Sequence, residues 1–289
     1  MKAKLFWLAV AALVCVGAWA QDGPPPPAKG SALAVQAFPG QAWTSLGDSS
    51  PVEHGNIQSE IYAEQGVTVF SAQGGSFTFT PYTALEFSND TYGFAWNNKV
   101  IVRAGGKFNK LFRHGIVSVG GGYAYENRYK NDPNIDVNLL NGTHALPASA
   151  GAAIGYVQGW FGWQPVADRR SRYPGSLWFA AGNIEPVEHG NVIGMGNVQQ
   201  GFVMARLGRV ILIPYAELRL SGDLQGYDWE NKAAGGGGIK VAVPRGNAYT
   251  EIGAGVRHES RFLSGLSASG VYVFLNTSFS WALFHKKGN

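Results

Sequence analysis

Hydrophobic and polar positions alternate along long stretches of the chain. Over residues 76–88, one face carries Phe77 and Phe87 and the opposite face carries Glu86. Residues 209–221 alternate in the same way. A period of two sustained over a dozen residues predicts a β-strand and not a helix.

Twelve such strands are predicted, in two groups of six. The first group is 41–47, 56–72, 76–88, 97–110, 115–129 and 146–163, and the second is 176–183, 191–206, 209–221, 231–243, 247–260 and 267–283. Short, often basic connections alternate with longer, mostly acidic ones. Short turns at one rim and long loops at the other are typical of membrane barrels. We therefore expect an all-β, antiparallel transmembrane β-barrel of about 12 strands.

The two groups of strands are related by an internal repeat. The hexapeptide from Pro51 to Asn56 recurs letter for letter from Pro186 to Asn191. Matching residues continue on both sides of it, including a tryptophan, an asparagine and a lysine that follow the third strand of each group. We infer two six-strand repeats, at about 41–163 and 176–283.

The start of the chain is typical of an exported protein. Residues 1–20 combine two lysines, an apolar run and the small residues Ala18 and Ala20, which together predict a signal peptide. The proline-rich residues 21–40 are expected to be a periplasmic tether, followed by the barrel at 41–283. Cys15 is the single cysteine of the chain and lies in the signal, which excludes a disulfide scaffold.

Composition limits the function classes further. A net charge of +4, part of it in the signal peptide, is too small for a nucleic-acid binder. Charged residues in mid-strand also argue against a dry β-sandwich, because an unpaired buried charge costs several kcal/mol. A water-filled lumen can hold such residues.

The polar strand faces carry the lumen charges Glu126, Arg128, Glu259, Arg261 and Arg257. Two interpretations stay open for them: ion pairing within a polar interior, or a selectivity ring for charged solutes.

These features together resemble the bacterial outer-membrane β-barrel class, including the aromatic-rich last strand from Val271 to Trp281. The chain also resembles the barrels of exopolysaccharide-secretion proteins. That resemblance covers about half of the chain and rests on Pro81-Tyr82 to Asn97-Asn98-Lys99 and on Gly253-Ala254-Gly255-Val256-Arg257 with the strand after it. It implies a location in the bacterial outer membrane and a role in exporting a saccharide.

The repeated hexapeptide is the most specific motif. It supplies the candidate loop residues Glu53, His54, Asn56, Glu188, His189 and Asn191. Three roles stay open for them: a loop brace, contact with a ligand or lipopolysaccharide, and catalysis. A lipid hydrolase would need a nucleophile beside the histidine. Serines precede the first copy but not the second, which favours a structural role.

Other candidate sites are less specific. Trp96 and Trp229 occupy equivalent strand starts, where they are expected to anchor the barrel at the membrane interface or to stack on sugars. The acidic outer loops offer oxygen ligands for Ca²⁺ or Mg²⁺, whereas no specific metal ligand set can be assigned. His258 has no clear partner in the sequence.

The sequence therefore predicts an outer-membrane barrel that allows passage or export of a polar substrate, with saccharides among the candidates, and no enzymatic step. The expected partners are outer-membrane lipid, lipopolysaccharide, the solute and components of a secretion complex. The alternatives are a lipid-modifying hydrolase with a Glu-His loop site and a non-conducting structural or adhesion barrel.

Overall fold

The computed structural model describes residues 38–48, 50–130 and 147–283. The strands of the first half are β1 (Phe38–Asp48), β2 (Ile57–Gly66), β3 (Phe70–Ala72), β4 (Phe77–Asp90), β5 (Lys99–Phe112), β6 (Gly115–Arg128) and β7 (Ser149–Trp163). Those of the second half are β8 (Gly175–Gly182), β9 (Ile193–Gly201), β10 (Ala205–Leu207), β11 (Val210–Asp223), β12 (Lys232–Arg245), β13 (Ala248–Arg261) and β14 (Ser267–Leu283). The predicted signal peptide and most of the predicted tether lie outside the described residues.

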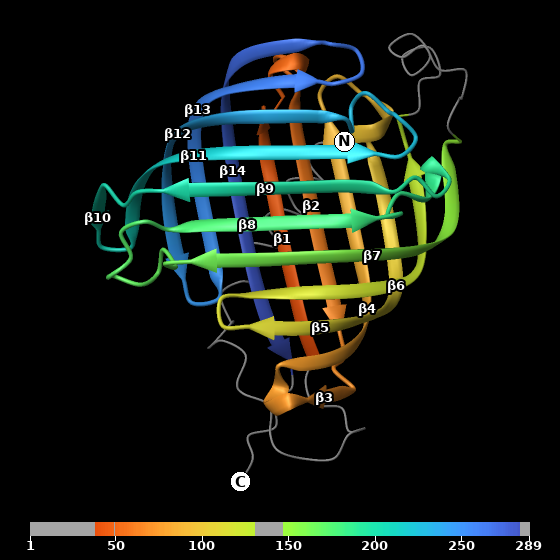
Figure 1. The fold of residues 1–289 in the computed structure, drawn as a ribbon, viewed down its shortest axis with the longest axis horizontal. Helices are drawn as coiled ribbons and strands as arrows, with labels where there is room; N and C mark the ends of the chain where they lie inside the picture. The colour runs from red at the N-terminus through yellow and green to blue at the C-terminus, as the bar shows by residue number, and fades with distance from the viewer. Residues whose placement is uncertain (1–37, 49, 131–146, 284–289) are drawn as a thin grey trace, which may run out of the picture.

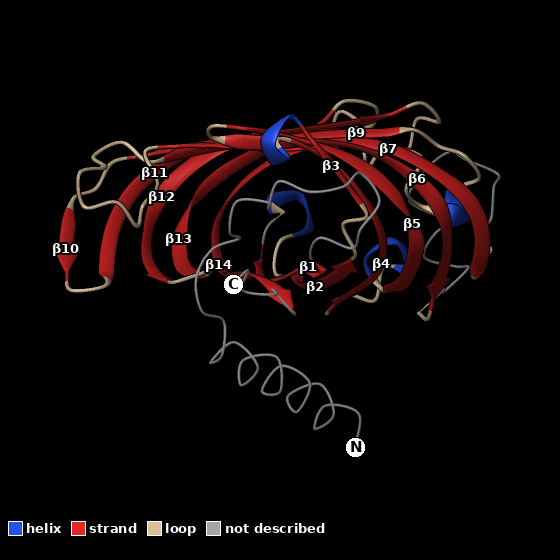
Figure 2. Ribbon diagram, turned by 90° about the horizontal axis from the view of Figure 1, so that it is seen from below, coloured by secondary structure: helices blue, strands red, loops and turns tan. Residues whose placement is uncertain are grey.

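All strands belong to one antiparallel sheet that closes on itself (Figures 1 and 2). The first strand, β1, pairs with β2 on one side and with β14 on the other. The short strands β3 and β10 continue β2 and β9, so the closed wall has twelve strands in cross-section. The prediction of an antiparallel barrel is confirmed, and its origin in two repeats stays a prediction.

The break between β2 and β3 explains how a proline fits into the wall. Gly66 lies opposite Tyr82 and Phe70 lies opposite Phe79, so β2–β3 holds one extra residue against β4. This is a β-bulge beside Pro81, whose carbonyl accepts a hydrogen bond from the Val67 amide at 2.9 Å. The same bulge recurs between β9 and β10, beside the proline of β11.

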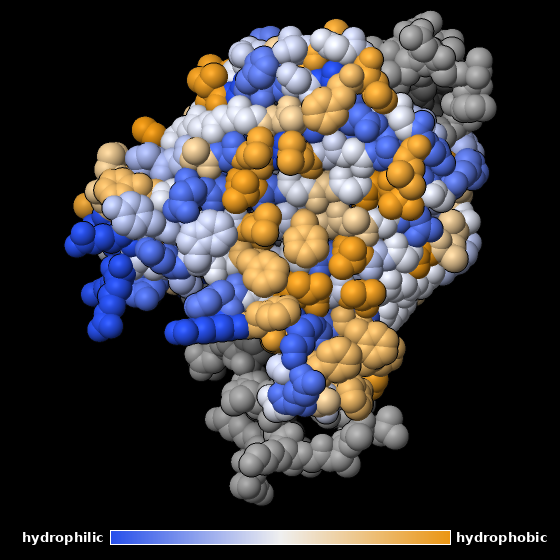
Figure 3. All heavy atoms as spheres, viewed as in Figure 1, coloured by the Kyte–Doolittle hydropathy of each residue, from blue (hydrophilic) through white to orange (hydrophobic). Residues whose placement is uncertain are grey.

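Alternation along each strand separates an inner from an outer face. On β5, Arg103 and Lys107 are buried, whereas Val102 and Phe108 are each 50% exposed. On β11, Glu217 is buried and Leu218 is 44% exposed. Apolar side chains consequently gather across the middle of the outer wall, as the orange spheres of Figure 3 show. The inner face is polar and charged.

The barrel has two unlike ends. The end that we call the turn end carries the short connections at 73–76, 113–114, 208–209 and 246–247, with the longer segment 164–174. Phe38 and Leu283 pair with each other there. The opposite end, the loop end, carries the longer segments 50–56, 91–98, 183–192 and 224–231 and the segment 262–266.

Two loops at the loop end contain short 3-10 helices that pack against the barrel wall. The helix η2 (Pro51–Glu53) contacts β13 and β14, and η5 (Pro186–Glu188) contacts β6 and β7. In the described part of the chain, no helical segment has the length and apolar character needed to cross a bilayer. The two helices therefore bring the repeated hexapeptide onto the inner wall.

Candidate functional site

The candidate site is the barrel interior at the loop end, where charges on the wall meet the two loops. Glu126 and Arg128 lie on β6, and Glu259 and Arg261 lie on β13, all four of them buried. Alternate residues of a strand share a face, so each arginine lies beside its own glutamate. The distance from Arg128 Nε to Glu126 Oε1 is 2.8 Å, and the equivalent distance from Arg261 to Glu259 is 3.3 Å.

The loop that carries η5 is ion-paired to the first of these walls. Arg128 Nη2 lies 3.2 Å from Glu188 Oε1 and 3.3 Å from Glu185 Oε2. Lys99 on β5 pairs with the same Glu185. The amide of Val187 donates a hydrogen bond of 3.1 Å to Glu126 Oε2. Arg128 thus holds three carboxylates, two of which come from the loop.

The loop that carries η2 is held by the second wall in the same manner. Arg261 Nη2 lies 2.6 Å from Glu53 Oε1. Deeper in the barrel, Arg257 pairs with Glu217, with Nε at 3.1 Å from Oε1, and its guanidinium lies 4.0 Å from the centre of the Tyr272 ring. These predicted lumen charges are therefore packed and paired in a polar interior. Their role in selecting solutes stays a prediction.

Asparagine side chains tie the hexapeptide loops to their neighbours. Asn56 Nδ2 donates hydrogen bonds to Glu53 Oε2 at 3.0 Å and to Asp90 Oδ2 at 2.9 Å. In the second copy, Asn191 makes the equivalent two bonds at 2.8 and 2.6 Å. Both asparagines are fully buried, so each bond satisfies a group that has left water. This geometry is that of a loop brace.

The glutamate and histidine of the motif do not form a pair. Glu53 and Glu188 are buried, whereas His54 and His189 are exposed. His189 adopts a left-handed backbone conformation with φ of 47°, which turns the chain toward Gly190. Among the described residues, no group of three or more His, Cys, Asp or Glu side chains could hold a metal ion. Ca²⁺ or Mg²⁺ binding at the acidic loops stays a prediction.

The buried loop carboxylates differ in their acidity. Burial, together with the negative charge of Glu185, raises the pKa of Glu188 to about 7. For Glu185, burial also opposes ionisation, but the charges of Lys99 and Arg128 outweigh it and hold its pKa below the ordinary value. The loop consequently contains one firmly ionised carboxylate and one that titrates near neutral pH.

An aromatic stack joins the two halves at the loop end. The indoles of Trp96 and Trp229 lie 4.8 Å apart with 4° between their planes. Phe94 stacks on Trp96 at 4.6 Å, and Tyr227 stacks on Trp229 at 4.7 Å. Both tryptophans are more than nine-tenths buried, so their predicted position at the lipid interface is wrong. They face each other inside because the two loops that carry them fold inward.

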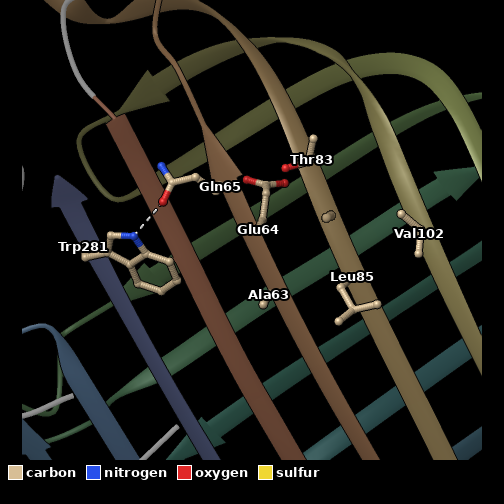
Figure 4. Close-up of a pocket in the computed structure, with 8 residues that line it drawn as sticks. Ala63, Glu64, Gln65, Thr83, Leu85, Val102 and Trp281 are labelled. Atoms are coloured by element: carbon tan, nitrogen blue, oxygen red, sulfur yellow. Dashed lines mark hydrogen bonds between the residues drawn. The ribbon is translucent and has the colours of Figure 1, made fainter. Parts of the chain in front are cut away.

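The outer wall contains a shallow hollow of about 410 Å³, but it belongs to the lipid-facing side (Figure 4). Ala63, Leu85 and Val102 line it, and Trp281 closes one end. The indole of Trp281 lies against Gly40, where a larger side chain would collide, and its Nε1 donates a 2.9 Å hydrogen bond to Gln65 Oε1.

The second half of the wall repeats this arrangement. Trp163 lies against Gly175 and donates a 2.9 Å hydrogen bond to Gln200 Oε1. A bonded indole of this kind presents its apolar ring outward and leaves no donor unpaired, as suits a membrane interface.

A closed wall with paired charges inside and an apolar band outside decides the class. Each of the twelve long strands is paired on both sides, and only the short strands β3 and β10 have a single neighbour, so the long strands leave no open sheet edge across the membrane. The chain is an outer-membrane β-barrel. The wall itself thus contacts membrane lipid, and the polar face encloses the lumen.

No protein-family model matches this outer-membrane barrel, and no curated protein is similar to it. The similar solved structures include the beta domain of the Bordetella autotransporter BrkA, at 12% identity over 85% of this chain and 99% of that one, with a TM-score of 0.39. LpxR from Salmonella typhimurium is 8% identical over 83% and 99%, with a TM-score of 0.38. The KdgM porin in complex with disordered oligogalacturonate is 8% identical over 83% and 98%, with a TM-score of 0.35.

Three features of the site were missed at the level of sequence. Lys99 and Glu185 join the ion-paired cluster, and Lys107 on β5 pairs with Glu64 on β2 at 2.6 Å. The parity of β2 and β5 would have placed Glu64 and Lys107 on the inner face. His258, which has no clear partner in the sequence, contacts three serine hydroxyls on the outer wall.

Proposed function

We propose that the barrel passes a polar solute across the outer membrane, with a saccharide as the favoured class, and that the passage involves no covalent step in the lumen. The observation that carries the proposal is the inner face. Charged and hydrogen-bonding side chains line the inner face of the closed wall. Such a lining suits a lumen that holds water or a polar solute. An apolar interior would stabilise a purely structural barrel equally well, because buried ion pairs add little net stability.

Aromatic side chains on the inner face favour a saccharide over a simple ion. Trp43 stacks on Tyr62 at 5.7 Å, and the Tyr62 hydroxyl donates a 2.9 Å hydrogen bond to Glu64. Trp178 on β8 remains 40% exposed opposite Asn197. A sugar ring has an apolar face and a rim of hydroxyl groups. Aromatic rings can stack on the apolar face, and the neighbouring carboxylate and amide groups can form hydrogen bonds with the hydroxyls.

The loop end is then the gate of this pathway. The stack from Phe94 through Trp96 and Trp229 to Tyr227 joins a loop of the first half to a loop of the second half at that end, beside the ion-paired loops. Passage requires that these loops separate or that a partner displaces them. A secretion-complex partner or lipopolysaccharide at the loops is consistent with this role and is part of the proposal.

Planar-bilayer recording tests the pore. We expect low or intermittent conductance from the intact protein and a several-fold higher open probability from Trp96→Ala combined with Trp229→Ala. Trp281→Phe, on the outer wall, is the matched control and should record like the intact protein. Liposome swelling with oligosaccharides of increasing size would then measure the permeant size.

The second candidate is a non-conducting structural barrel, which the same buried aromatic stack favours. It predicts silence from the intact protein and also from the double tryptophan variant. A silent double variant that still folds, as judged by its heat-shifted migration in electrophoresis, would therefore remove the pore proposal. The Glu-His hydrolase alternative finds no support in the site, because the glutamate of each loop is buried in ion pairs whereas its histidine is exposed.

A further inference from the structure

His258 lies at the centre of a cluster of serine hydroxyls on the outer wall. Its Nδ1 is 2.9 Å from Ser269 Oγ. Its Nε2 is 3.1 Å from Ser267 Oγ and 3.2 Å from Ser260 Oγ. The imidazole and the hydroxyls of Ser267 and Ser269 are exposed, and Ser260 is partly so. Both ring nitrogens of a single exposed histidine are thereby engaged by hydroxyl groups.

The pairing of β13 with β14 builds this cluster. His258 lies opposite Ser269, and Ser260 lies opposite Ser267. Since alternate residues share a face, all four side chains project outward from two adjacent pairs of one ladder. All four residues belong to paired strands, so the register of the ladder and not a loop sets the positions of the hydroxyls around the ring.

The cluster lies at the boundary of the apolar band. It occupies the last pairs of the ladder before the loop at 262–266. On the side toward the middle of the wall, Val256 is 58% exposed and Val271 is 67% exposed. Beyond the cluster, Leu266 is 48% exposed. At such a boundary the acyl chains of a lipid meet its polar part, which is the level of the ester groups.

The fold does not require these residues. When the two halves are aligned on Glu126 and Glu259, Tyr125 and Asn127 occupy the positions of His258 and Ser260. On the neighbouring strand, Asn127 pairs with Ser149 just as Ser260 pairs with Ser267. The first half thus builds the same pair of strands without a histidine, so the cluster needs an explanation other than the architecture.

We propose that this cluster is an ester-hydrolase site that acts on acyl esters of membrane lipids. Ser267 is the nucleophile, because its hydroxyl is the closer and the more exposed of the two beside Nε2. His258 is the general base. Ser269 is a positioning residue: its hydroxyl oxygen accepts a hydrogen bond from Nδ1–H, which keeps the proton on Nδ1 and the lone pair on Nε2. The site lies outside the lumen and does not depend on solute passage.

The reaction has two steps. Ser267 Oγ attacks the ester carbonyl carbon while its proton passes to His258 Nε2. The bond from this carbon to the alcohol oxygen then breaks, and the alcohol leaves with that proton, which produces an acyl-serine. Water attacks the acyl carbon, gives one proton to Nε2 and releases the fatty acid as Ser267 Oγ recovers the proton from the imidazole.

The experiment uses the full chain, folded in mixed micelles of dodecyl maltoside and dioleoylphosphatidylcholine, with a parallel sample in lipopolysaccharide. Released fatty acid is measured by mass spectrometry, and a fluorophosphonate probe reports a nucleophilic serine. We expect fatty-acid release and probe labelling of the peptide that contains Ser267. Release from only one of the two lipids identifies the source of the ester.

Variants assign the roles. Ser267→Ala should abolish labelling and release, and His258→Gln should lower both by roughly 100-fold or more. Ser269→Ala should lower release, and Ser269→Asn should restore it, because an amide oxygen can accept the same hydrogen bond from Nδ1–H. A merely structural serine would not be rescued in this way. Ser149→Ala and His114→Ala, which change the same residue types elsewhere, should leave release unchanged.

Three outcomes would overturn the proposal. One is that neither lipid is hydrolysed and no serine is labelled by the folded protein. Another is that the probe labels a serine outside the cluster. The third is that His258→Gln, shown to be folded by heat-shift electrophoresis, hydrolyses lipid as well as the unaltered chain. In each case the four residues would be a polar contact between two strands and nothing more.

Discussion

The two loop-to-wall junctions at the loop end have the same plan but different ion pairs. In one, Arg128 holds Glu126, Glu185 and Glu188, and Lys99 adds a second cation. In the other, Arg261 holds Glu53, Glu259 and, at 3.9 Å, Asp228.

The sequence difference between the junctions is small. Ser50 precedes the first hexapeptide at the position that Glu185 occupies before the second. In both junctions the wall arginine therefore pairs with the glutamate of the hexapeptide, whereas the residue before the hexapeptide differs. Shared contacts indicate what the fold needs, and unshared ones indicate where the halves have separate tasks.

The largest test of this comparison removes the two arginines. Arg128→Ala removes the arginine that pairs with Glu126 and Glu188 and leaves Glu185 with Lys99 alone, so it should lower the free energy of unfolding by about 3–5 kcal/mol. Arg261→Ala should lower the free energy of unfolding by less than Arg128→Ala, because one of the three carboxylates of Arg261, that of Asp228, lies as far away as 3.9 Å. Urea titration of the folded barrel in micelles measures both. Arg209→Ala, at an exposed turn, is the control, and equal losses from all three variants would contradict the comparison.

The pH dependence of the second junction comes next. Glu188 has a pKa raised from 4.5 to about 7, first by burial and then by the charge of Glu185. A carboxyl with a raised folded-state pKa stabilises most below its unfolded pKa, and this stabilisation is lost as pH rises through the folded value. As pH rises from 4.5 to 7, the free energy of unfolding of Glu188→Gln should therefore increase relative to that of the natural protein, by up to roughly 3 kcal/mol. A constant difference across this range would refute the assignment.

The asparagine braces should give equal effects in the two halves. Asn56→Ala and Asn191→Ala each remove two buried hydrogen bonds to carboxylates and should each cost about 1–2 kcal/mol. The midpoints of urea unfolding measure both losses, provided that the dependence of the unfolding free energy on urea concentration is the same for each variant. If only one of the two variants is destabilised, the hexapeptide is not the same brace in both copies.

The smallest effect concerns the outer wall. Trp163→Phe and Trp281→Phe each lose one indole hydrogen bond to a glutamine and should cost about 0.5–1 kcal/mol. The two values should match, because each ring lies over a glycine in the same way. A markedly larger loss for Trp281 would mean that the hollow beside Ala63 adds packing that the other copy lacks.

Local patterns predicted the wall well. Period-two alternation over 76–88 and 209–221 placed Phe77 and Leu218 outside and Glu86 and Glu217 inside, because side-chain direction in a strand depends only on parity. The bulges beside the prolines also agree with a proline's need for an irregular point in the ladder.

Contacts made by the loops could not be predicted. Trp96 and Trp229 were expected at strand starts and therefore as membrane anchors, yet they lie in the loops before β5 and β12, which fold inward and bring the two indoles together. The partners of Arg128 lie 57 and 60 residues away in sequence, so no local spacing indicates them. The cluster at His258 depends on the register of β13 against β14, which a single sequence does not determine.

The parallel indoles of Trp96 and Trp229 also give the barrel a built-in optical reporter. The excited states of two identical chromophores stacked at 4.8 Å couple, so the pair gives an absorption and fluorescence signal that two separated indoles do not. That signal exists only while the loops from opposite halves touch. Spectroscopy on the unlabelled protein can therefore test whether the two loops stay in contact, during refolding or after a candidate solute is added.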